Sequence, residues 1–333
     1  MNNTYILLVN WNGWRDTIEC LESVFRNDFP GYKVIVCDNG SGDGSMEHIK
    51  AWANGLEPAL VPAGHPLRHL TYPPVAKPIA WVEYGRDAAE KGGKAEDDRV
   101  RLILIQTGDN LGFAGGNNVG LRYALARDDF NFVWLLNNDT VIEPGALSHL
   151  VRRMEESPDA GLCGSTLPFY SKHGLLYARG GGTYNRWIAY IRHVGHHEPV
   201  SRREGCDRVE RRLDFVAGAS MLVSRAFLKG IGLLCEDYFL YFEELDWAAR
   251  CRGRYRLAYA PESIVYHKVG ASMTIYNDLN NYQIASKTLF LENIMRFTRK
   301  FYPWAAPTVW LAIQAAKSLY FARRQWSRLS RGG

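Results

Sequence analysis

Polar side chains able to bind charged ligands follow two apolar runs of this sequence. The run "VWLL" is followed by Asn137, Asn138 and Asp139, and the run "KVIVC" is followed by Asp38 and Asn39. Such groups stay buried only if they find partners. Because a carboxylate beside amides suits a hard divalent cation that bridges to phosphate oxygens, Asp139 is a candidate metal ligand. The alternative is an Asx turn that only caps the strand.

A second acidic group lies in "YFEELDWAAR", where Glu243, Glu244 and Asp246 follow an aromatic run. On a helix, Glu244 has Trp247 as a neighbour, and an apolar setting can raise the pKa of a carboxylate toward that of a general base. Glu243, Asp246 and Arg250 would share one helix face, which also fits a structural set of ion pairs. Spacing alone does not decide which glutamate is the base.

A histidine and two glycine-rich segments complete the candidate chemistry. His267 ends an apolar run in "VYHKVGAS", where a neutral imidazole could complete a metal site begun by Asp139, although single histidines are more often structural. The segment "NLGFAGGNNVG" contains Gly116 and Asn117 and reads as a loop whose backbone can approach a flat or anionic ligand. The segment "NGSGDGS" lacks the spacing of a dinucleotide-binding fingerprint.

The first 150 residues alternate apolar runs with helical stretches. The expected strands cover residues 5–10, 33–38, 101–106 and 131–136, and the expected helices cover 15–27, 45–53 and 117–128. This alternation predicts an α/β protein with a doubly wound, mostly parallel sheet covered by helices on both faces. Ligands bind beyond the carboxyl ends of such strands, so Asp38 and Asp139 are expected at one edge. Residues 55–99, rich in Pro, Gly and charge, read as an insertion with little regular structure.

Composition bounds the class of protein. The chain has 333 residues, 47% of them apolar, which fits a folded protein with a substantial core. The apolar stretch at the N-terminus is short and lacks a basic region before it, so it predicts a strand and not a signal peptide. The six cysteines show no C-x-x-C spacing, which argues against a zinc site or a disulfide framework and favours the cytoplasm.

The C-terminal segment is basic. Residues 293–333 contain eight Lys or Arg residues and no Asp or Glu. Within it, the apolar stretch 304–321 is interrupted by Pro307, Gln314 and Lys317, so it does not read as a spanning helix. Two interpretations remain open: a helix lying on an anionic membrane surface, as on the inner face of the plasma membrane, or a helix packed on the body.

Seven motifs together resemble those of the family 2 inverting glycosyltransferases, in their bacterial rhamnosyltransferase-like branch. In family order they are "VNWNG", "VCDNGSGDGS", "NLGFAGGNN", "LLNNDT", "VAGASMLVSR", "YFEELDWAAR" and "HKVGAS", and they span about residues 5–275. The resemblance implies a GT-A fold over residues 1–285 and a helical basic tail over 286–333. Within the fold, residues 1–150 would bind the nucleotide sugar, with the insertion 55–99, and residues 151–285 would bind the acceptor.

The resemblance also implies roles for particular residues. The D-x-D metal motif of the family falls on Asn137–Asp139, so Asp139, with His267, is expected to hold Mg²⁺ or Mn²⁺. The family's acidic pair falls on Glu243 and Glu244, with glutamate in place of the usual aspartate at the position of the base, Glu244. The residues expected at the donor are Asn10, Asn12, Asp38, Asn39, Gly116, Asn117, Asn138 and Asp139.

The implied reaction is metal-dependent transfer of a sugar, with inversion, from a nucleoside diphosphate donor to a hydroxyl of a glycan or polyprenyl-linked saccharide. The branch implies dTDP-rhamnose as donor and cell-surface polysaccharide synthesis as the setting. Trp187, which could stack on a sugar, and Asp246 are the candidate acceptor residues, and no nucleic-acid partner is expected. The alternatives are a nucleotidyltransferase, although "VNWNGWRD" lacks the basic glycine-rich loop of that class, and a non-catalytic glycan-binding protein.

Overall fold

The computed structural model describes residues 3–94, 100–269 and 279–315. The strands are β1 (Thr4–Asn10), β2 (Tyr32–Asp38), β3 (Trp81–Gly85), β4 (Leu102–Gln106), β5 (Phe132–Leu136), β6 (Thr140–Ile142), β7 (Ala160–Pro168), β8 (Leu176–Arg179), β9 (Gly181–Asn185), β10 (Tyr190–His193), β11 (Phe215–Val216), β12 (Ser220–Ser224) and β13 (Arg256–His267). The helices are α1 (Trp14–Val24), α2 (Ser45–Ala53), α3 (Arg86–Ala89), α4 (Gly112–Arg127), α5 (Ala146–Glu155), α6 (Cys206–Glu210), α7 (Arg225–Ile231), α8 (Glu243–Cys251) and α9 (Leu279–Phe301), with 3₁₀ turns η1 (Arg68–Leu70) and η4 (Pro303–Ala305).

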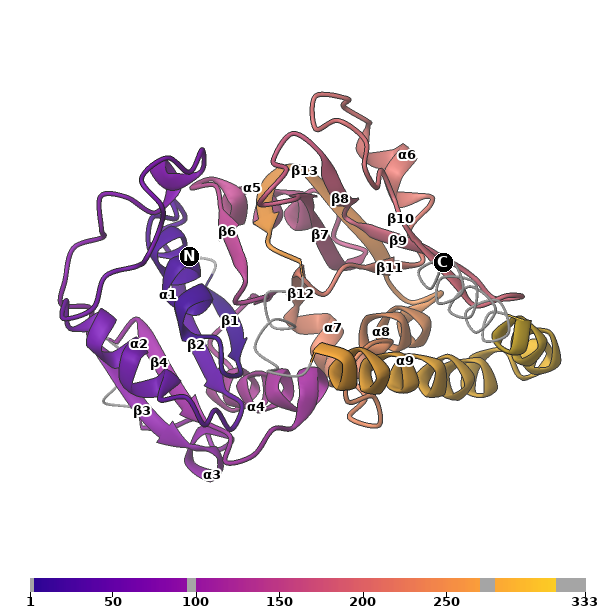
Figure 1. Cartoon of the computed structure of the whole chain (residues 1–333), viewed down its shortest axis with the longest axis horizontal. Coiled ribbons are helices and arrows are strands. Elements are labelled where there is room, and N and C mark those ends of the chain that lie inside the picture. The colour runs from indigo at the N-terminus through magenta and orange to yellow at the C-terminus, as the bar shows by residue number, and fades with distance from the viewer. Residues whose placement is uncertain (1–2, 95–99, 270–278, 316–333) are drawn as a thin grey trace, which may run out of the picture.

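One mixed sheet runs through the molecule, with helices on both sides (Figure 1). Its strand order is β10-β9-β8-β7-β12-β5-β1-β2-β4-β3. The N-terminal part, from β5 to β3, is parallel throughout. The C-terminal part begins at β12, which pairs antiparallel with both β5 and β7. The expected α/β fold with a mostly parallel N-terminal sheet is therefore confirmed.

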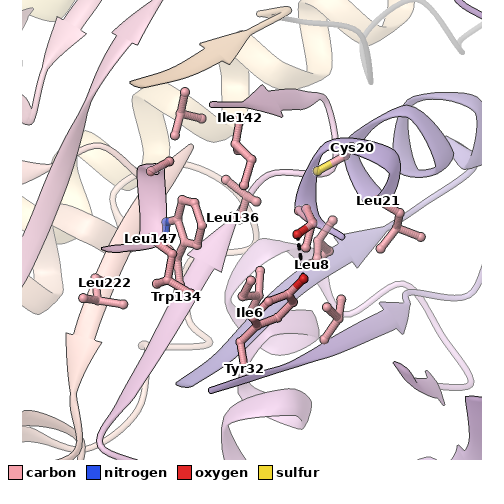
Figure 2. Close-up of a cluster of buried hydrophobic side chains, with 14 of the residues drawn as sticks. Ile6, Leu8, Cys20, Leu21, Tyr32, Trp134, Leu136, Ile142, Leu147 and Leu222 are labelled. Carbon is pink, nitrogen blue, oxygen red and sulfur yellow. Dashed lines mark hydrogen bonds between the residues drawn. The ribbon is translucent and has the colours of Figure 1, made fainter. Parts of the chain in front are cut away.

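Alternate residues of the parallel strands enter two separate cores, which explains why those strands are apolar throughout. Ile6 and Leu8 of β1 pack with Trp134 and the helices α1 and α5, as Figure 2 shows. Leu7, between them, packs on the opposite face with residues of α4 such as Val119. Each fully buried aliphatic side chain of this kind contributes about 1.5–3 kcal/mol to stability.

Strand β13 brings two polar residues that are distant in sequence, His267 and Asp139, close together. It runs parallel to β7, and its last three residues pair antiparallel with β6. In that register His267 lies opposite Thr140, the residue after Asp139. Pairing between strands more than a hundred residues apart therefore places His267 beside Asp139.

The segment "NLGFAGGNNVG" is not a loop, because α4 begins at Gly112 and includes its remaining glycines. A side chain at Gly115 would come 2.6 Å from Leu111 Cβ, and one at Gly120 would come 2.3 Å from Leu7 Cδ1. The glycines therefore allow the helix to pack closely against the sheet. The expectation of a flexible loop was wrong, since this packing outweighs the low helix propensity of glycine.

The insertion at residues 55–99 is more regular than expected. It contains β3, which extends the parallel sheet beside β4, and the short helix α3.

The C-terminal segment packs on the body over its described part. Phe297 and Tyr302 are buried in one cluster with Phe242, the residue before α8, and Val309 and Ile313 belong to the same cluster. No helix in the parts of the chain that the structure describes is long and apolar enough to cross a membrane. Residues 316–333 of the predicted tail lie outside the described residues.

Candidate active site

Two adjoining cavities lie beyond the carboxyl ends of β1, β2 and β5. The first, here called the amide cavity, has a volume of about 190 Å³ and is lined by Val9, Trp11, Asn39, Asn110, Gly112, Phe113, Asn117, Leu136, Asn137, Asn138, Phe239 and Leu240. The second, here called the acid cavity, measures about 290 Å³ and is lined by Phe113, Asn137, Asp139, Tyr177, His193, Ala217, Gly218, Ala219, Leu240, Tyr241, Glu243, Glu244, His267 and Val269. Phe113, Asn137 and Leu240 line both, so the cavities share a wall.

Asp38 and Asn10 form a buried network at the ends of β2 and β1. Asn10 Nδ2 and Ser41 Oγ donate to Asp38 Oδ1 at 2.7 and 2.6 Å, and Thr17 Oγ1 donates to Asn10 Oδ1 at 2.8 Å. Asn12 adds two contacts, because its N–H donates to Ser41 Oγ and its Oδ1 accepts from the backbone of the same loop. Asp38 and Asn10 line neither cavity. In this structure they fix the loop that follows β2.

Asn39 ties that loop to the start of α4. Its Nδ2 donates to the Gly112 carbonyl at 3.1 Å, and its Oδ1 accepts from the Leu111 N–H at 3.1 Å. Gly116 permits this contact, because a side chain there would come 3.2 Å from Asn39 Cγ. Asn117 donates to the Phe113 carbonyl at 2.9 Å. The amide cavity is therefore walled by side-chain amides on a rigid helix start and by aromatic rings.

Asp139 lies in the turn between β5 and β6, where His267 faces it. His267 Nε2 is 3.2 Å from Asp139 Oδ1, and the Lys268 N–H donates to the Asp139 carbonyl at 3.0 Å. Burial acts to raise the pKa of the Asp139 carboxyl, but His267 and Lys268 outweigh it and hold that pKa below its ordinary value. Asp139 is thus a buried, ionised carboxylate.

The residues at Asp139 fit a divalent cation that is shared with a phosphate ligand. Among described residues, neither Asp139 Oδ1 nor His267 Nδ1 has a well-aligned hydrogen-bond partner. The Lys268 ammonium does not compete for Asp139, because it binds Asp16 and Glu19. No group of three or more His, Cys, Asp or Glu in the described ranges could hold a metal alone. Asp139 and His267 therefore suit a cation that takes its other ligands from a diphosphate and water.

Glu243 and Glu244 begin α8 after a strained turn. Tyr241 and Phe242 have φ values of 72° and 79°, in the left-handed region that bulky residues rarely adopt. Burial, and then the charge of Glu244, raise the pKa of Glu243 well above its ordinary value. Both causes favour the protonated, neutral form of Glu243.

Glu244 is half-buried and faces the acid cavity. Burial raises the pKa of its carboxyl, while the backbone N–H groups of Glu244 and Gly218 act in the opposite direction. Gly218 makes this approach possible, because a side chain at that position would come 2.8 Å from Glu244 Oε1. Of the two glutamates, Glu244 is the one placed to accept a proton from a ligand in the cavity.

Tyr177 and His193 also line the acid cavity, and no motif marks either of them. The Tyr177 ring lies 4.4 Å from the His193 ring and 5.2 Å from the His267 ring, between centroids. Burial raises the pKa of Tyr177, and the charges of Glu244 and Asp139 raise it further, so both acids act on its hydroxyl. Burial, with His196 and His267, lowers the pKa of His193 to about 4, which leaves it neutral at pH 7.

The two predicted acceptor residues lie elsewhere. Asp246 is buried in ion pairs with Arg250 at 2.6 Å and Lys300 at 2.5 Å. Trp187 is exposed at the turn between β9 and β10, with its ring centroid 4.5 Å from that of Trp304. Neither side chain lines the amide cavity or the acid cavity.

Sequence comparison finds similarity to glycosyltransferases over part of the chain. Residues 86–230 match the family described as Glycosyl transferase family 2. The hexosyltransferase Agl10 of low-salt glycan biosynthesis, from Haloferax volcanii, is 25% identical over 206 residues, which cover 59% of this chain and 63% of Agl10. The matched part therefore spans less than two thirds of that relative.

Comparison with solved structures identifies the fold. The mannosyltransferase PcManGT from Pyrobaculum calidifontis, solved with GDP-Man and Mn²⁺, superposes with a TM-score of 0.54 at 15% identity, covering 95% of this chain and 75% of PcManGT. GalNAc-T7, solved with UDP, GalNAc and Mn²⁺, gives a TM-score of 0.51 at 13% identity, covering 80% of this chain and 44% of its own. This chain has the GT-A fold, and its residues 86–230 are similar to the family 2 glycosyltransferases.

Proposed function

We propose that this protein is a metal-dependent inverting glycosyltransferase that uses a nucleoside diphosphate sugar. The observation that carries the proposal is that Asp139 and Glu244 line one cavity, which shares a wall with the amide cavity. If the diphosphate of a nucleotide sugar bound at Asp139, its nucleoside would lie in the amide cavity and its sugar in the acid cavity. In this arrangement the sugar of the donor would face Glu244.

The amide cavity is the proposed nucleoside site. Asn39, Asn117 and Asn138 supply amides, while Trp11 and Phe239 supply aromatic surface that suits a flat base. Asp139 and His267 would hold Mg²⁺ or Mn²⁺, which when bound neutralises charge on the departing diphosphate. PcManGT and GalNAc-T7 were both solved with Mn²⁺, which is consistent with this choice.

Glu244 is the proposed general base. Its carboxylate would take the proton of an acceptor hydroxyl as that oxygen attacks the anomeric carbon on the face opposite the diphosphate, so configuration inverts. Burial and the charge of Glu244 favour the neutral form of Glu243, which would add no second negative charge beside the base. Tyr177 shares the cavity with Glu244 and Asp139, whose charges both raise the pKa of its hydroxyl. Its side chain would position the sugar between these two acids.

The finer assignments rest on the motif resemblance. We propose rhamnose from dTDP-rhamnose as the donor and a glycan or polyprenyl-linked saccharide as the acceptor, in cytoplasmic synthesis of cell-surface polysaccharide. The named relative Agl10 is a hexosyltransferase of glycan biosynthesis, which agrees with the class of reaction and leaves the sugar open.

A panel of donors tests the proposal. The protein with Mn²⁺ should release nucleoside diphosphate from one of dTDP-rhamnose, GDP-mannose and UDP sugars, because water can replace a missing acceptor slowly. Chromatography of the nucleotide products measures this release. Release of pyrophosphate would indicate a nucleotidyltransferase, and no turnover with any donor and a range of acceptors would favour a glycan-binding protein.

Gly218→Ala should lower the transfer rate by about 10²-fold, because small displacements of a catalytic group have effects of that size. The added methyl group would lie 2.8 Å from Glu244 Oε1 and 3.2 Å from Glu244 Cγ. Its neighbours are flexible side chains, so the fold should persist. Gly64→Ala is the control, because nothing lies within 4 Å of that position. Equal kcat in both variants would show that Gly218 does not set the position of Glu244.

A further inference from the structure

An exposed aromatic surface lies where the β9–β10 hairpin meets the C-terminal segment. Trp187, Ile188, Tyr190 and Trp304 form this surface, here called the aromatic face, and each side chain is 50–60% exposed. The Trp187 and Trp304 rings touch edge to face across 117 residues of sequence. In Figure 1 the hairpin reaches the yellow C-terminal helix at the right of the molecule.

The aromatic face is held in place from below. Tyr184 of β9 stacks with Tyr302 at 6.3 Å between centroids, and both pack against the buried Phe297. Arg186 lies over the rings of Tyr302 and Trp304 at 5.8 and 5.9 Å. The exposed rings are therefore fixed by packing. Large exposed apolar patches on folded proteins mark sites that bind other proteins or membranes.

The chain segments that form the aromatic face are basic. Residues 180–197, which contain the hairpin, include Arg186 and Arg192 and no Asp or Glu. The acidic residue Asp214, which accepts from the Tyr184 N–H, pairs with Arg252 at 3.7 Å. Residues 293–333 likewise contain no acidic residue. Arg186 and Arg192 are exposed, and the Arg186 guanidinium lies over the Trp304 ring. Trp and Tyr favour the boundary between lipid and water, and arginines without acidic neighbours favour anionic headgroups.

We propose that the aromatic face docks this protein on an anionic membrane surface. Two segments would form this docking site. The C-terminal segment supplies Trp304, and the hairpin supplies Trp187, Ile188, Tyr190 and the two arginines. Trp310 and Leu311, 52% and 60% exposed on the helical segment 306–315, extend the apolar area along the same segment.

The hairpin also links the aromatic face to the acid cavity. Strand β10 runs from Tyr190 to His193, and His193 lines that cavity. Three residues of extended chain span about 10 Å. Docking would therefore hold the acid cavity close to the bilayer. If the proposed function is correct, the acceptor is then a saccharide attached to a lipid in that bilayer.

Vesicle sedimentation of the full chain tests the docking. The variant Trp187→Ser/Trp304→Ser should bind vesicles containing an anionic phospholipid at least about tenfold more weakly than the wild type, since buried apolar area sets the binding strength. Arg186→Gln/Arg192→Gln should weaken binding to these vesicles by about 25-fold, at about fivefold per charge. The control is Leu56→Ser/Leu60→Ser, which removes side chains that are 80% and 64% exposed on the insertion.

Equal binding by the wild type and the aromatic variant would overturn the proposal, as would wild-type binding that needs no anionic lipid. A wild-type dimer that the aromatic variant converts to a monomer, measured by light scattering without vesicles, would instead assign the face to self-association. Release of nucleoside diphosphate in solution is measured in parallel. It should be unchanged in the variants, and its absence from the wild type would refute the proposed function without affecting the vesicle result.

Discussion

Glu244→Gln should lower the rate of sugar transfer by about 10²–10⁴-fold, the usual contribution of a general base, with the donor Kd unchanged. Glutamine keeps the shape of the side chain but cannot take the proton of the attacking hydroxyl. Glu244 lines the acid cavity and does not line the amide cavity, so the nucleoside should bind as before. Single-turnover rates and calorimetric titration with the nucleoside diphosphate measure the two effects separately.

Glu243→Gln is the matched control for that variant. Burial and the charge of Glu244 favour the protonated form of Glu243. A glutamine there resembles that form in shape and charge, so the variant should transfer sugar at nearly the wild-type rate. The wild-type rate should also fall as the pH drops through the raised pKa of Glu244, because protonation removes the base. Loss of transfer in Glu243→Gln, with activity retained in Glu244→Gln, would move the role of base to Glu243.

The N-terminal half of the fold could be predicted because its strands obey a local rule. A parallel strand covered on both faces is apolar at every position, so runs such as residues 33–38 stand out without knowledge of their neighbours. The polar residues that end those runs then share an edge of the sheet. On that basis Asn39, Asn138 and Asp139 were expected together, and all three line the two adjoining cavities.

The acid cavity could be predicted only in part. Tyr177 lies on β8 and His193 on β10. These strands join the sheet through β7, and their approach to Asp139 depends on the antiparallel pairing of β12 with both β7 and β5, which are distant in sequence. No periodicity within either strand encodes that register. His267 was expected near Asp139 from its ligand chemistry and from the motif resemblance, and the pairing of β13 with β6 is the physical reason for it.

The glycines of α4 show why a glycine-rich segment can be mistaken for a loop when it is a tightly packed helix. Glycine lowers helix propensity, so a segment with Gly112, Gly115, Gly116 and Gly120 reads as a loop. The missing side chains are needed because the helix lies against β1 and the loop after β2, where an added Cβ at Gly116 would come 2.9 Å from Val9 Cγ1. Only the packed structure reveals that constraint.

Asp139→Ala should abolish the effect of Mn²⁺ on donor binding. The wild type should bind the nucleoside diphosphate about 10- to 100-fold more tightly with Mn²⁺ than with a chelator, as expected for one or two charge-assisted contacts of about 1.5–3 kcal/mol. The variant should show equal Kd values in both conditions, and transfer should cease. Calorimetric titration, which does not depend on turnover, measures this difference.

Two further variants separate the metal role from a structural one. Asp139→Asn retains the volume and the hydrogen-bonding capacity beside His267 but removes the charge, so it should keep the wild-type Tm and still lose the Mn²⁺ effect. His267→Ala should weaken Mn²⁺ dependence less, because a neutral imidazole neutralises no cation charge. If Asp139→Asn bound the nucleotide with full Mn²⁺ dependence, the buried carboxylate would serve only to hold the turn between β5 and β6 against β13, and the cation would have to be held by other residues.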